Sequence, residues 1–261
     1  MNSAPYWPVP QGMPRVALVT GGAARLGRAI ALELAHAGFD VGLHYNHSMQ
    51  AARETAAEIR ALGRQAHLVQ ADLACEAAVT PLLGAVTHAL GPVGVLVNNA
   101  SLFRRDEWDS ATRAGWDAHI EPNTRAPFVL MQEFARLLPA HAEGMVLNML
   151  DERVWSLTPH FVSYTVSKAA LWTLTQTMAL ALAPRNIRVN AIGPGPVLPT
   201  PAQSAEQFAR QCASVPLGRV ATPDEIARAA LSLVCLPSVT GQMLALDGGQ
   251  HMQWSPTPVR G

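Results

Sequence analysis

The chain has 261 residues, of which 49% are hydrophobic and 15% are charged, and its formal net charge at pH 7 is zero. This length and composition suit a single α/β domain with a large core. The balanced charge gives no electrostatic reason to expect nucleic acid or an anionic membrane as a partner. No apolar run reaches the roughly 18 residues of a membrane-spanning helix.

The N-terminal segment is rich in proline and has no hydrophobic stretch of the signal-peptide kind. We therefore expect residues 1–14 to form a flexible tail, followed by one domain over residues 15–261, in the cytoplasm.

The three cysteines, Cys75, Cys212 and Cys235, lie far apart and show no metal-binding spacing. Free thiols in a reducing compartment are the expected state, and no metal site is predicted.

The first predicted strand, residues 15–20, leads into a glycine-rich turn and an amphipathic helix that ends at Gly38. This succession is the context of a dinucleotide-binding site, because glycines let the backbone approach a pyrophosphate at the N-terminus of the helix. Gly21 and Gly27 occupy positions expected of the glycine fingerprint, whereas Arg25 stands where the middle glycine is usual.

The second predicted strand, residues 40–45, ends in the sequence HYNHS and has no acidic residue there. NAD enzymes usually place an acid at this point to bind the ribose 2′-hydroxyl, whereas the 2′-phosphate of NADP would not be repelled by this sequence. Asn46, His47, Ser48 and Arg25 could donate hydrogen bonds to that phosphate. The sequence therefore favours NADP over NAD, with a polar turn that binds nothing as the alternative.

Strands and helices alternate along the rest of the chain. Helices are expected at residues 49–62, 75–90, 124–137, 161–183 and 206–212 and from Thr222 onward, and strands at 65–71, 94–97, 143–149, 187–192 and 243–246. A loop that contains Trp108 and Trp116 is expected before the helix that begins near Thr124. The alternation predicts a Rossmann-type, doubly wound parallel sheet of about seven strands, with helices on both faces.

Two positions carry local signals of their own. Thr222 can cap a helix in which Pro223 suits the first turn and Glu225 completes a capping box. Asp72, which closes the third strand, has two open interpretations: contact with an adenine amino group, or the N-cap of the helix over 75–90.

The helix over residues 161–183 carries Tyr164 and Lys168 four residues apart and therefore on one face. A lysine ammonium beside a phenol favours the phenolate, so we expect Lys168 to lower the pKa of Tyr164 from about 10. Tyr164 would then act as an acid or a base near neutral pH. Asn98 and Asn99 follow strand 94–97, at the edge where ligands bind in open α/β sheets.

Together these residues resemble the short-chain dehydrogenase/reductase family over about residues 15–249. The features that carry the resemblance are, in chain order, Thr20 to Gly27 (TGxxxxxG), Asp72, Asn98 to Ala100 (NNA), Asn123, Tyr164 with Lys168 (YxxxK), Pro194-Gly195 and Asp247 to Gly249 (DGG). Each feature is weak alone, but their occurrence in order and at the family spacing is a strong indication.

Two departures narrow the resemblance to a subgroup. Most of the family has a serine about thirteen residues before the tyrosine, where this chain has Asp151, and most have a glycine where this chain has Arg25. With HYNHS and Phe103, these residues look like pteridine reductase, and the bacterial dihydromonapterin reductases are similar in having the aspartate.

The resemblance implies NADPH-dependent reduction of a pterin, from 7,8-dihydropterin to tetrahydropterin, by a homotetramer, with dihydrofolate as a further candidate substrate. One alternative is an ordinary NADP(H)-dependent carbonyl or alcohol oxidoreductase in which Asp151 is incidental. Another is a cofactor-binding protein without turnover.

The predicted catalytic residues are Asp151, Tyr164, Lys168 and Asn123. Reduction of a C=N bond needs hydride at carbon and a proton at nitrogen, and a carboxyl group beside the tyrosine could deliver or relay that proton. The resemblance implies that Lys168 orients the nicotinamide ribose, that Asn123 holds a water, and that Phe103 stacks on the flat pterin.

The predicted binding residues fall into two sets. The cofactor set is Gly21, Arg25, Leu26, Gly27, His44, Tyr45, Asn46, His47, Ser48, Asp72, Leu73, Asn99, Ala100, Ser101, Tyr164, Lys168, Pro194 and Gly195. The substrate set is Arg25, Ser101, Phe103, Asp151 and Tyr164. A short lid near residues 195–215 is expected to cover the site.

Overall fold

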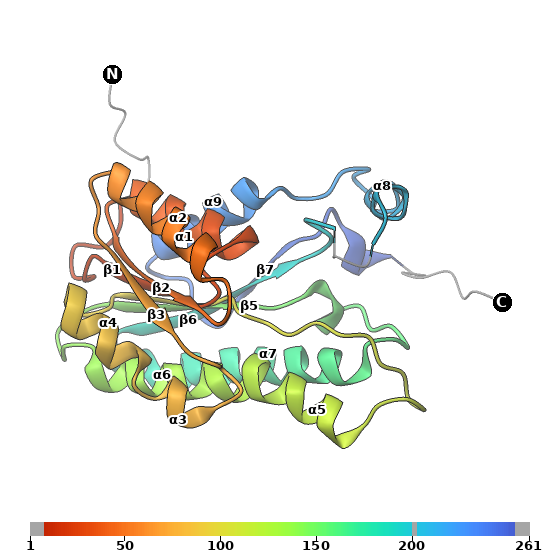
Figure 1. Cartoon of the computed structure of the whole chain (residues 1–261), viewed down its shortest axis with the longest axis horizontal. Helices are drawn as coiled ribbons and strands as arrows, with labels where there is room; N and C mark the ends of the chain where they lie inside the picture. The colour runs from red at the N-terminus through yellow and green to blue at the C-terminus, as the bar shows by residue number, and fades with distance from the viewer. Residues whose placement is uncertain (1–7, 200–202, 254–261) are drawn as a thin grey trace.

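A computed structural model describes residues 8–199 and 203–253 of the chain. Its centre is one sheet of seven strands (Figure 1). The strands are β1 (Val16–Val19), β2 (Asp40–Tyr45), β3 (Ala66–Gln70), β4 (Val95–Asn98), β5 (Gly144–Met149), β6 (Ile187–Pro194) and β7 (Met243–Leu246). Their spatial order is β3-β2-β1-β4-β5-β6-β7, and every neighbouring pair is parallel. The prediction of a doubly wound parallel sheet of about seven strands is confirmed.

Helices cover both faces of this sheet (Figure 1). One face carries α1 (Arg25–His36), α2 (Met49–Ala61) and α9 (Pro223–Val234), and the other carries α3 (Glu76–Val79), α4 (Leu82–Leu90), α6 (Ala126–Leu137) and α7 (Val162–Leu182). Because both faces are covered, strands β1, β2, β4, β5 and β6 are buried along their whole length, which explains their near-continuous apolar sequences.

The strand order reverses direction between β1 and β4, which lie side by side although β2 and β3 separate them in the chain. The chain after β1 leads to α1 on one face of the sheet, and the chain after β4 leads to α6 on the other face. Ligands of open α/β sheets bind at such a point. The glycine turn after β1 and the two asparagines Asn98 and Asn99 at the end of β4 both lie there.

The C-terminal end of α9 is fixed to the sheet by a buried arginine. The guanidinium of Arg188, on β6, donates hydrogen bonds of 2.7–3.3 Å to four carbonyls, those of Leu233, Val234, Leu236 and Val239. The cation thereby satisfies carbonyls that the last turn of a helix leaves unpaired. At the other end of α9, Thr222 and Glu225 form the predicted capping box.

Three predictions of secondary structure are corrected. The helix expected at 75–90 is two helices, α3 and α4, because Pro81 has no backbone N–H with which to continue the hydrogen-bonded helix. The expected loop around Trp116 contains the helix α5 (Arg113–Ile120), which Thr112 caps by accepting the Gly115 N–H at 3.1 Å.

The third correction concerns the N-terminal tail. Val9 and Met13 are buried against the main core, and the carbonyl of Gly12 accepts the backbone N–H of Glu143 at 2.9 Å. Packing therefore begins before Arg15, since the tail contributes two apolar side chains of its own. Residues 1–7 lie outside the described part of the chain.

Candidate active site

The turn after β1 requires its glycines. Gly21 has a φ of +61°, and a Cβ added to Gly27 would lie 2.2 Å from the carbonyl oxygen of Gly21, closer than any real contact. The N-cap residue of α1, Ala24, offers no side-chain hydrogen bond, and the first turn has no acidic residue. The N–H groups at this helix end are therefore available to an anion such as a pyrophosphate.

Arg25 begins α1 with a left-handed φ of +52°. Its side chain reaches across to the loop after β6, where its Nη2 donates to the carbonyl of Pro199 at 3.1 Å. The predicted contacts of Arg25 with the cofactor and with the pterin substrate stay predictions. The structure adds a link between the glycine turn and the loop on the substrate side.

His44 supports the glycine turn, and its predicted contact with the cofactor stays a prediction. Its Nδ1 accepts the Gly21 N–H at 3.1 Å, so its Nε2 carries the proton and donates to the carbonyl of Ala71 at 3.0 Å. Both ring nitrogens are thereby used, the side chain is buried, and burial lowers the pKa of His44. A neutral His44 joins the glycine turn to the ends of β2 and β3.

The other residues predicted around the 2′-phosphate are partly available. His47 and Ser48 are exposed, whereas Tyr45 is buried. Asn46 lies beside Asp72, with 3.5 Å between its Nδ2 and the Asp72 Oδ1. The N-cap of the following helix is Cys75 and not Asp72. Asp72 instead accepts the Ala74 N–H in the turn before that helix. Leu73, next to it, is buried.

Asn99 and Ala100 hold the glycine turn from the side of β4. Their N–H groups both donate to Thr20 Oγ1, at 2.9 and 3.0 Å, and the Asn99 side chain donates to the carbonyl of Thr20 at 2.9 Å. Ser101, the next residue, is exposed, and its hydroxyl donates to the Leu102 carbonyl at 3.3 Å. The first two residues thus shape the turn, and the third faces outward.

Asn123 is fully buried on a π-helix, η1 (Glu121–Arg125). Its Oδ1 accepts the Leu102 N–H at 2.8 Å, and its Nδ2 donates to the Leu102 carbonyl and to Ser167 Oγ at 2.9 and 3.0 Å. Both polar atoms of the side chain have protein partners, and the prediction that Asn123 holds a water stays a prediction. The side chain clamps the loop after β4 to α7.

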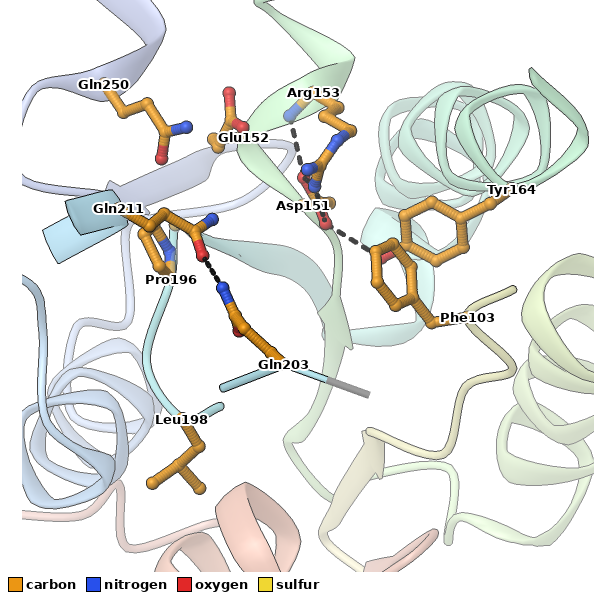
Figure 2. Close-up of a pocket in the computed structure, with 11 residues that line it drawn as sticks. Phe103, Asp151, Glu152, Arg153, Tyr164, Pro196, Leu198, Gln203, Gln211 and Gln250 are labelled. Atoms are coloured by element: carbon orange, nitrogen blue, oxygen red, sulfur yellow. Dashed lines mark hydrogen bonds and ion pairs between the residues drawn. The ribbon is translucent and has the colours of Figure 1, made fainter. Parts of the chain in front are cut away.

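Asp151 and Tyr164 meet at the mouth of the site (Figure 2). The Tyr164 hydroxyl donates to Asp151 Oδ2 at 2.9 Å. Both oxygens of Asp151 accept from Nη1 of Arg153 at 3.0 Å, and Oδ1 also accepts the Arg153 backbone N–H. The carboxylate begins a short helix, η2 (Glu152–Val154), and capping that helix fixes its orientation.

The predicted pKa of Tyr164 is wrong in direction for the protein alone. Burial, and then the negative charge of Asp151, raise the pKa of Tyr164 well above 10. Lys168 does not oppose this, because its Nζ lies 5.9 Å from the centroid of the tyrosine ring and donates to the Met149 carbonyl at 2.8 Å. Burial also lowers the pKa of Lys168 to about 8. Tyr164 is therefore a protonated donor at neutral pH.

Aromatic rings form one wall of the site. Phe103 stacks on Phe161, with ring centroids 4.6 Å apart and planes 9° apart, and meets Tyr164 edge to face at 4.7 Å. The Arg153 guanidinium lies 5.7 Å from the Phe103 centroid and 5.4 Å from that of Phe161. Phe103 is 38% exposed, so this wall presents an aromatic surface to a ligand.

A pocket opens between this wall and the segments after β5, β6 and β7 (Figure 2). Its lining residues are Phe103, Asp151, Glu152, Arg153, Tyr164, Gly195, Pro196, Leu198, Gln203, Gln211 and Gln250. Gly195 follows Pro194 at the end of β6, where a Cβ would lie 2.9 Å from Asp247, so the strand end needs glycine to pass β7. Of the predicted substrate residues, Phe103, Asp151 and Tyr164 line this pocket.

The predicted lid contains the helix α8 (Ala205–Ala213), none of whose residues is buried. Ser204 and Gln207 form a capping box that starts it, and Gln203 donates to Gln211 Oε1 at 2.8 Å. Residues 200–202 lie outside the described part of the chain. Light packing over the pocket is what a movable cover requires, and the lid stays a prediction.

Sequence reasoning missed four residues of this site: Glu152, Arg153, Phe161 and Gln250. Arg153 follows Asp151 by two positions, and this acid–base spacing was the available signal. Phe161 has a φ of +58° at the N-terminus of α7, which no sequence pattern announces. Gln250 lies on η4 (Gln250–Met252), which packs against η2 although ninety-odd residues separate them.

The residues fit a dinucleotide at the carboxyl edge of β1 and β4. A glycine turn that no Cβ could occupy, an uncapped helix N-terminus and exposed polar side chains after β2 are the groups that such a ligand needs.

Among the described residues, no cluster of three or more metal-ligating side chains occurs. In the same part of the chain, no helix has the length and apolar character that crossing a membrane would demand.

Comparison with known proteins identifies the family. A family model described as Enoyl-(Acyl carrier protein) reductase matches residues 21–251. A 3beta-hydroxysteroid dehydrogenase 1 from Eggerthella lenta is 34% identical over 247 residues, covering 91% of this chain and 94% of that protein. The chain belongs to the short-chain dehydrogenase/reductase family.

Two solved structures from Brucella are closely similar. FolM Alternative dihydrofolate reductase 1 from Brucella suis, in complex with NADP, is 45% identical with a TM-score of 0.89, covering 93% of this chain and 96% of that one. The protein of the same description from Brucella canis, complexed with NADP, is 44% identical with a TM-score of 0.91, covering 97% and 100%.

Proposed function

We propose that this oxidoreductase reduces the pterin ring of 7,8-dihydropterins to tetrahydropterins with NADPH. The observation that carries the proposal is the Asp151 carboxylate, which stands where most of the family has serine and accepts the Tyr164 hydroxyl at 2.9 Å. A serine can hold a carbonyl oxygen, but a carboxyl group can also relay a proton from solvent to Tyr164, which donates to the substrate nitrogen.

NADP(H) is the cofactor of this chain, as the Brucella structures with NADP support. It would be held by the glycine turn, the N-terminus of α1 and the polar residues after β2, and it supplies the hydride when bound. Lys168, buried beside Tyr164 and hydrogen-bonded to Met149, would face the nicotinamide ribose.

The proton for the substrate nitrogen comes from Tyr164. Burial and Asp151 keep the tyrosine protonated at neutral pH, so its hydroxyl can donate as the nitrogen gains electrons. Asp151, which faces the pocket and is 14% exposed at its side chain, then relays a proton from solvent back to the phenolate. Arg153 holds the carboxylate in place during both steps.

The pterin ring would lie against the aromatic wall. Phe103 has one face on Phe161 and is partly exposed, and a flat heteroaromatic ring gains from offset stacking on such a surface. The description of the Brucella relatives as alternative dihydrofolate reductases supports a pterin-type substrate.

The test is a parallel assay. Purified protein is mixed with NADPH, and the loss of NADPH absorbance is followed with 7,8-dihydrobiopterin, 7,8-dihydromonapterin and 7,8-dihydrofolate. An Asp151→Ser variant runs beside the wild type. Pterin-dependent oxidation that collapses in the variant supports the proposal, and absence of pterin turnover in a protein that binds NADPH overturns it.

The second candidate is a general NADP(H)-dependent carbonyl or alcohol oxidoreductase. The similarity to a hydroxysteroid dehydrogenase favours it. Ketone reduction that survives Asp151→Ala, with pterins left unreduced, would support this candidate. For either function we also propose a homotetramer in the cytoplasm, to be tested by light scattering and by fractionation of the source cells.

A further inference from the structure

The helix that carries Tyr164 is capped by a residue from another segment of the chain. Its own N-cap residue, Phe161, has a left-handed φ and makes no side-chain hydrogen bond to the first turn of α7. Asp106, in the loop between β4 and α5, supplies the missing acceptor, because its Oδ1 accepts the Ser163 N–H at 3.2 Å. A carboxylate at a helix N-terminus is also favoured by the helix dipole. The first turn of α7, and Tyr164 with it, is therefore held from outside the helix.

The same carboxylate ends a chain of buried hydrogen bonds. Nδ1 of His119, on α5, lies 2.7 Å from Ser163 Oγ, and the Ser163 hydroxyl donates to Asp106 Oδ2. Because His119 Nε2 accepts the backbone N–H of Arg104 at 3.1 Å, the proton of the neutral ring is on Nδ1, which donates to Ser163. Ser163 is fully buried and His119 is 2% exposed, so water does not compete for these bonds.

The ring of His119 is neutral at neutral pH. Burial lowers the pKa of His119, and the charge of Arg104 acts in the same direction. The hydrogen bond from Nδ1 to the Gly115 carbonyl and the charge of Asp106 act in the opposite direction. Only the neutral ring can accept from one neighbour and donate to another at the same time, so both of its contacts depend on this state.

These contacts join Tyr164 to the loop that carries Phe103. The carbonyl of Asp106 accepts the Phe161 N–H at 2.9 Å, so the loop is bonded to the start of α7 through its backbone as well as through the carboxylate. Phe103 lies in the same loop, and its ring meets the Tyr164 ring edge to face at 4.7 Å. The aromatic wall and the Tyr164 hydroxyl therefore take their relative position from the same loop-to-helix contacts.

We propose that Asp106, Ser163 and His119 are positioning residues for the reaction: they fix the first turn of α7 against the loop, so that the Tyr164 hydroxyl meets a substrate placed on the Phe103 ring. None of the three lines the substrate pocket, so each acts through Tyr164 or Phe103 and not through a contact with the ligand. The inference rests on Tyr164 as the proton donor, a role that both candidate functions share.

The test is the replacement Asp106→Ala, which removes the acceptor of both Ser163 donors. We expect kcat for 7,8-dihydromonapterin, expressed per NADPH-binding site, to fall about tenfold, because displacing a proton donor slows the chemical step. The affinity for NADPH should not change, since other residues hold the glycine turn. Counting NADPH-binding sites removes any loss due to unfolded protein, so a residue that only stabilises the fold would leave this kcat unchanged.

Three further variants test whether the residues act as one network. Asp106→Asn keeps one oxygen that can accept from Ser163 and should recover part of the lost kcat. Ser163→Ala should lower kcat as well, and the double variant should lose less than the product of the two single losses, because both changes break the same chain of hydrogen bonds. Asp109→Ala is the matched control, since it removes an exposed acid of the same loop, and it should leave kcat unchanged.

The outcomes separate this inference from pterin reduction. An unchanged kcat per site in Asp106→Ala would overturn the inference, and so would a change confined to KM, since Tyr164 would then have stayed in place. If dihydropterins are not reduced, the same variants are assayed with a 3-ketosteroid; a similar fall in kcat there supports the positioning role although pterin reduction has failed. A protein that reduces neither substrate would refute Tyr164 as the donor, and this inference with it.

Discussion

The replacement of Asp151 by asparagine tests the core of the proposed chemistry. In the wild type, Oδ2 accepts from the Tyr164 hydroxyl and from Arg153 Nη1, and Oδ1 accepts from the Arg153 backbone and the same Nη1. Both oxygens therefore face donors. Asparagine keeps the shape of the side chain, but its NH₂ group must face at least one donor, and it has no carboxyl group through which to relay a proton.

The expected loss follows from that relay. General acid–base catalysis typically contributes about 10²–10⁴-fold. Because Tyr164 itself remains in Asp151→Asn, we expect the lower end of the range, a fall in kcat of about 100-fold, which corresponds to about 2.7 kcal/mol. The pKa of Tyr164 should fall as well, since the Asp151 charge is one of the causes that raise it.

The assay is steady-state oxidation of NADPH with 7,8-dihydromonapterin, accompanied by NADPH binding measured by fluorescence and by thermal unfolding. The unfolding curve is needed because Asp151→Asn leaves the Arg153 guanidinium, 18% exposed at its side chain, without its anion, and breaking such a pair is destabilising. A folded, NADPH-binding variant whose kcat lies within threefold of the wild type would refute the role of Asp151.

Three further changes have defined outcomes. Gly27→Ala should weaken NADPH binding by about 100-fold. The added Cβ would lie 2.2 Å from the Gly21 carbonyl oxygen and would displace α1 far enough to misplace the ligand. Gly84→Ala is the control: a Cβ there meets nothing within 4 Å, so NADPH binding should be unchanged. Arg188→Met should lower the free energy of unfolding by about 3 kcal/mol, since it removes the donors of four hydrogen bonds to carbonyls. Denaturation with urea measures the free energy of unfolding, and a loss below about 1 kcal/mol would contradict the prediction. Glu152→Gln should change how the stability of the protein depends on pH. The pKa of Glu152 is raised from 4.5 to about 8 in the folded protein. The contribution of the Glu152 side chain to stability is therefore present below pH 4.5 and is lost as the pH rises towards 8. The wild type should therefore lose about 1.4 kcal/mol per pH unit relative to Glu152→Gln across that window, and parallel pH profiles would refute the raised pKa.

The order of strands and helices could be read from the sequence because each element has a local signal. Apolar runs between glycine and proline marked the strands, and Thr222 with Glu225 marked the start of α9, where the structure has the same capping box. Pro81 was an available signal for the break between α3 and α4, but the helical periodicity on either side of it hid that break.

The site was only partly predictable, because its geometry depends on contacts between distant segments. Asp151, Tyr164 and Phe103 were found from their positions in the sequence, and they meet in the pocket. The role of His44 depends on Gly21 and Ala71, which lie in two other segments. The pKa of Tyr164 depends on burial and on a carboxylate thirteen residues away, and a rule based on the neighbouring lysine could not include either.

The π-helix η1 has a consequence for how this protein tolerates length changes. A π-helical turn holds one residue more than an α-helical turn, so the residues after it are rotated by about 100° relative to an uninterrupted α-helix. Asn123 lies within this inserted turn and reaches Leu102 on one side and Ser167 on the other. Deleting one of the other residues between 121 and 125 would rotate α5 relative to α6 by about 100°, and Pro122 and Pro127 would still interrupt the backbone hydrogen bonds of a regular α-helix. Asn123 would then no longer reach both Leu102 and Ser167. The segment therefore resists shortening during evolution or engineering, even where every remaining side chain is unchanged.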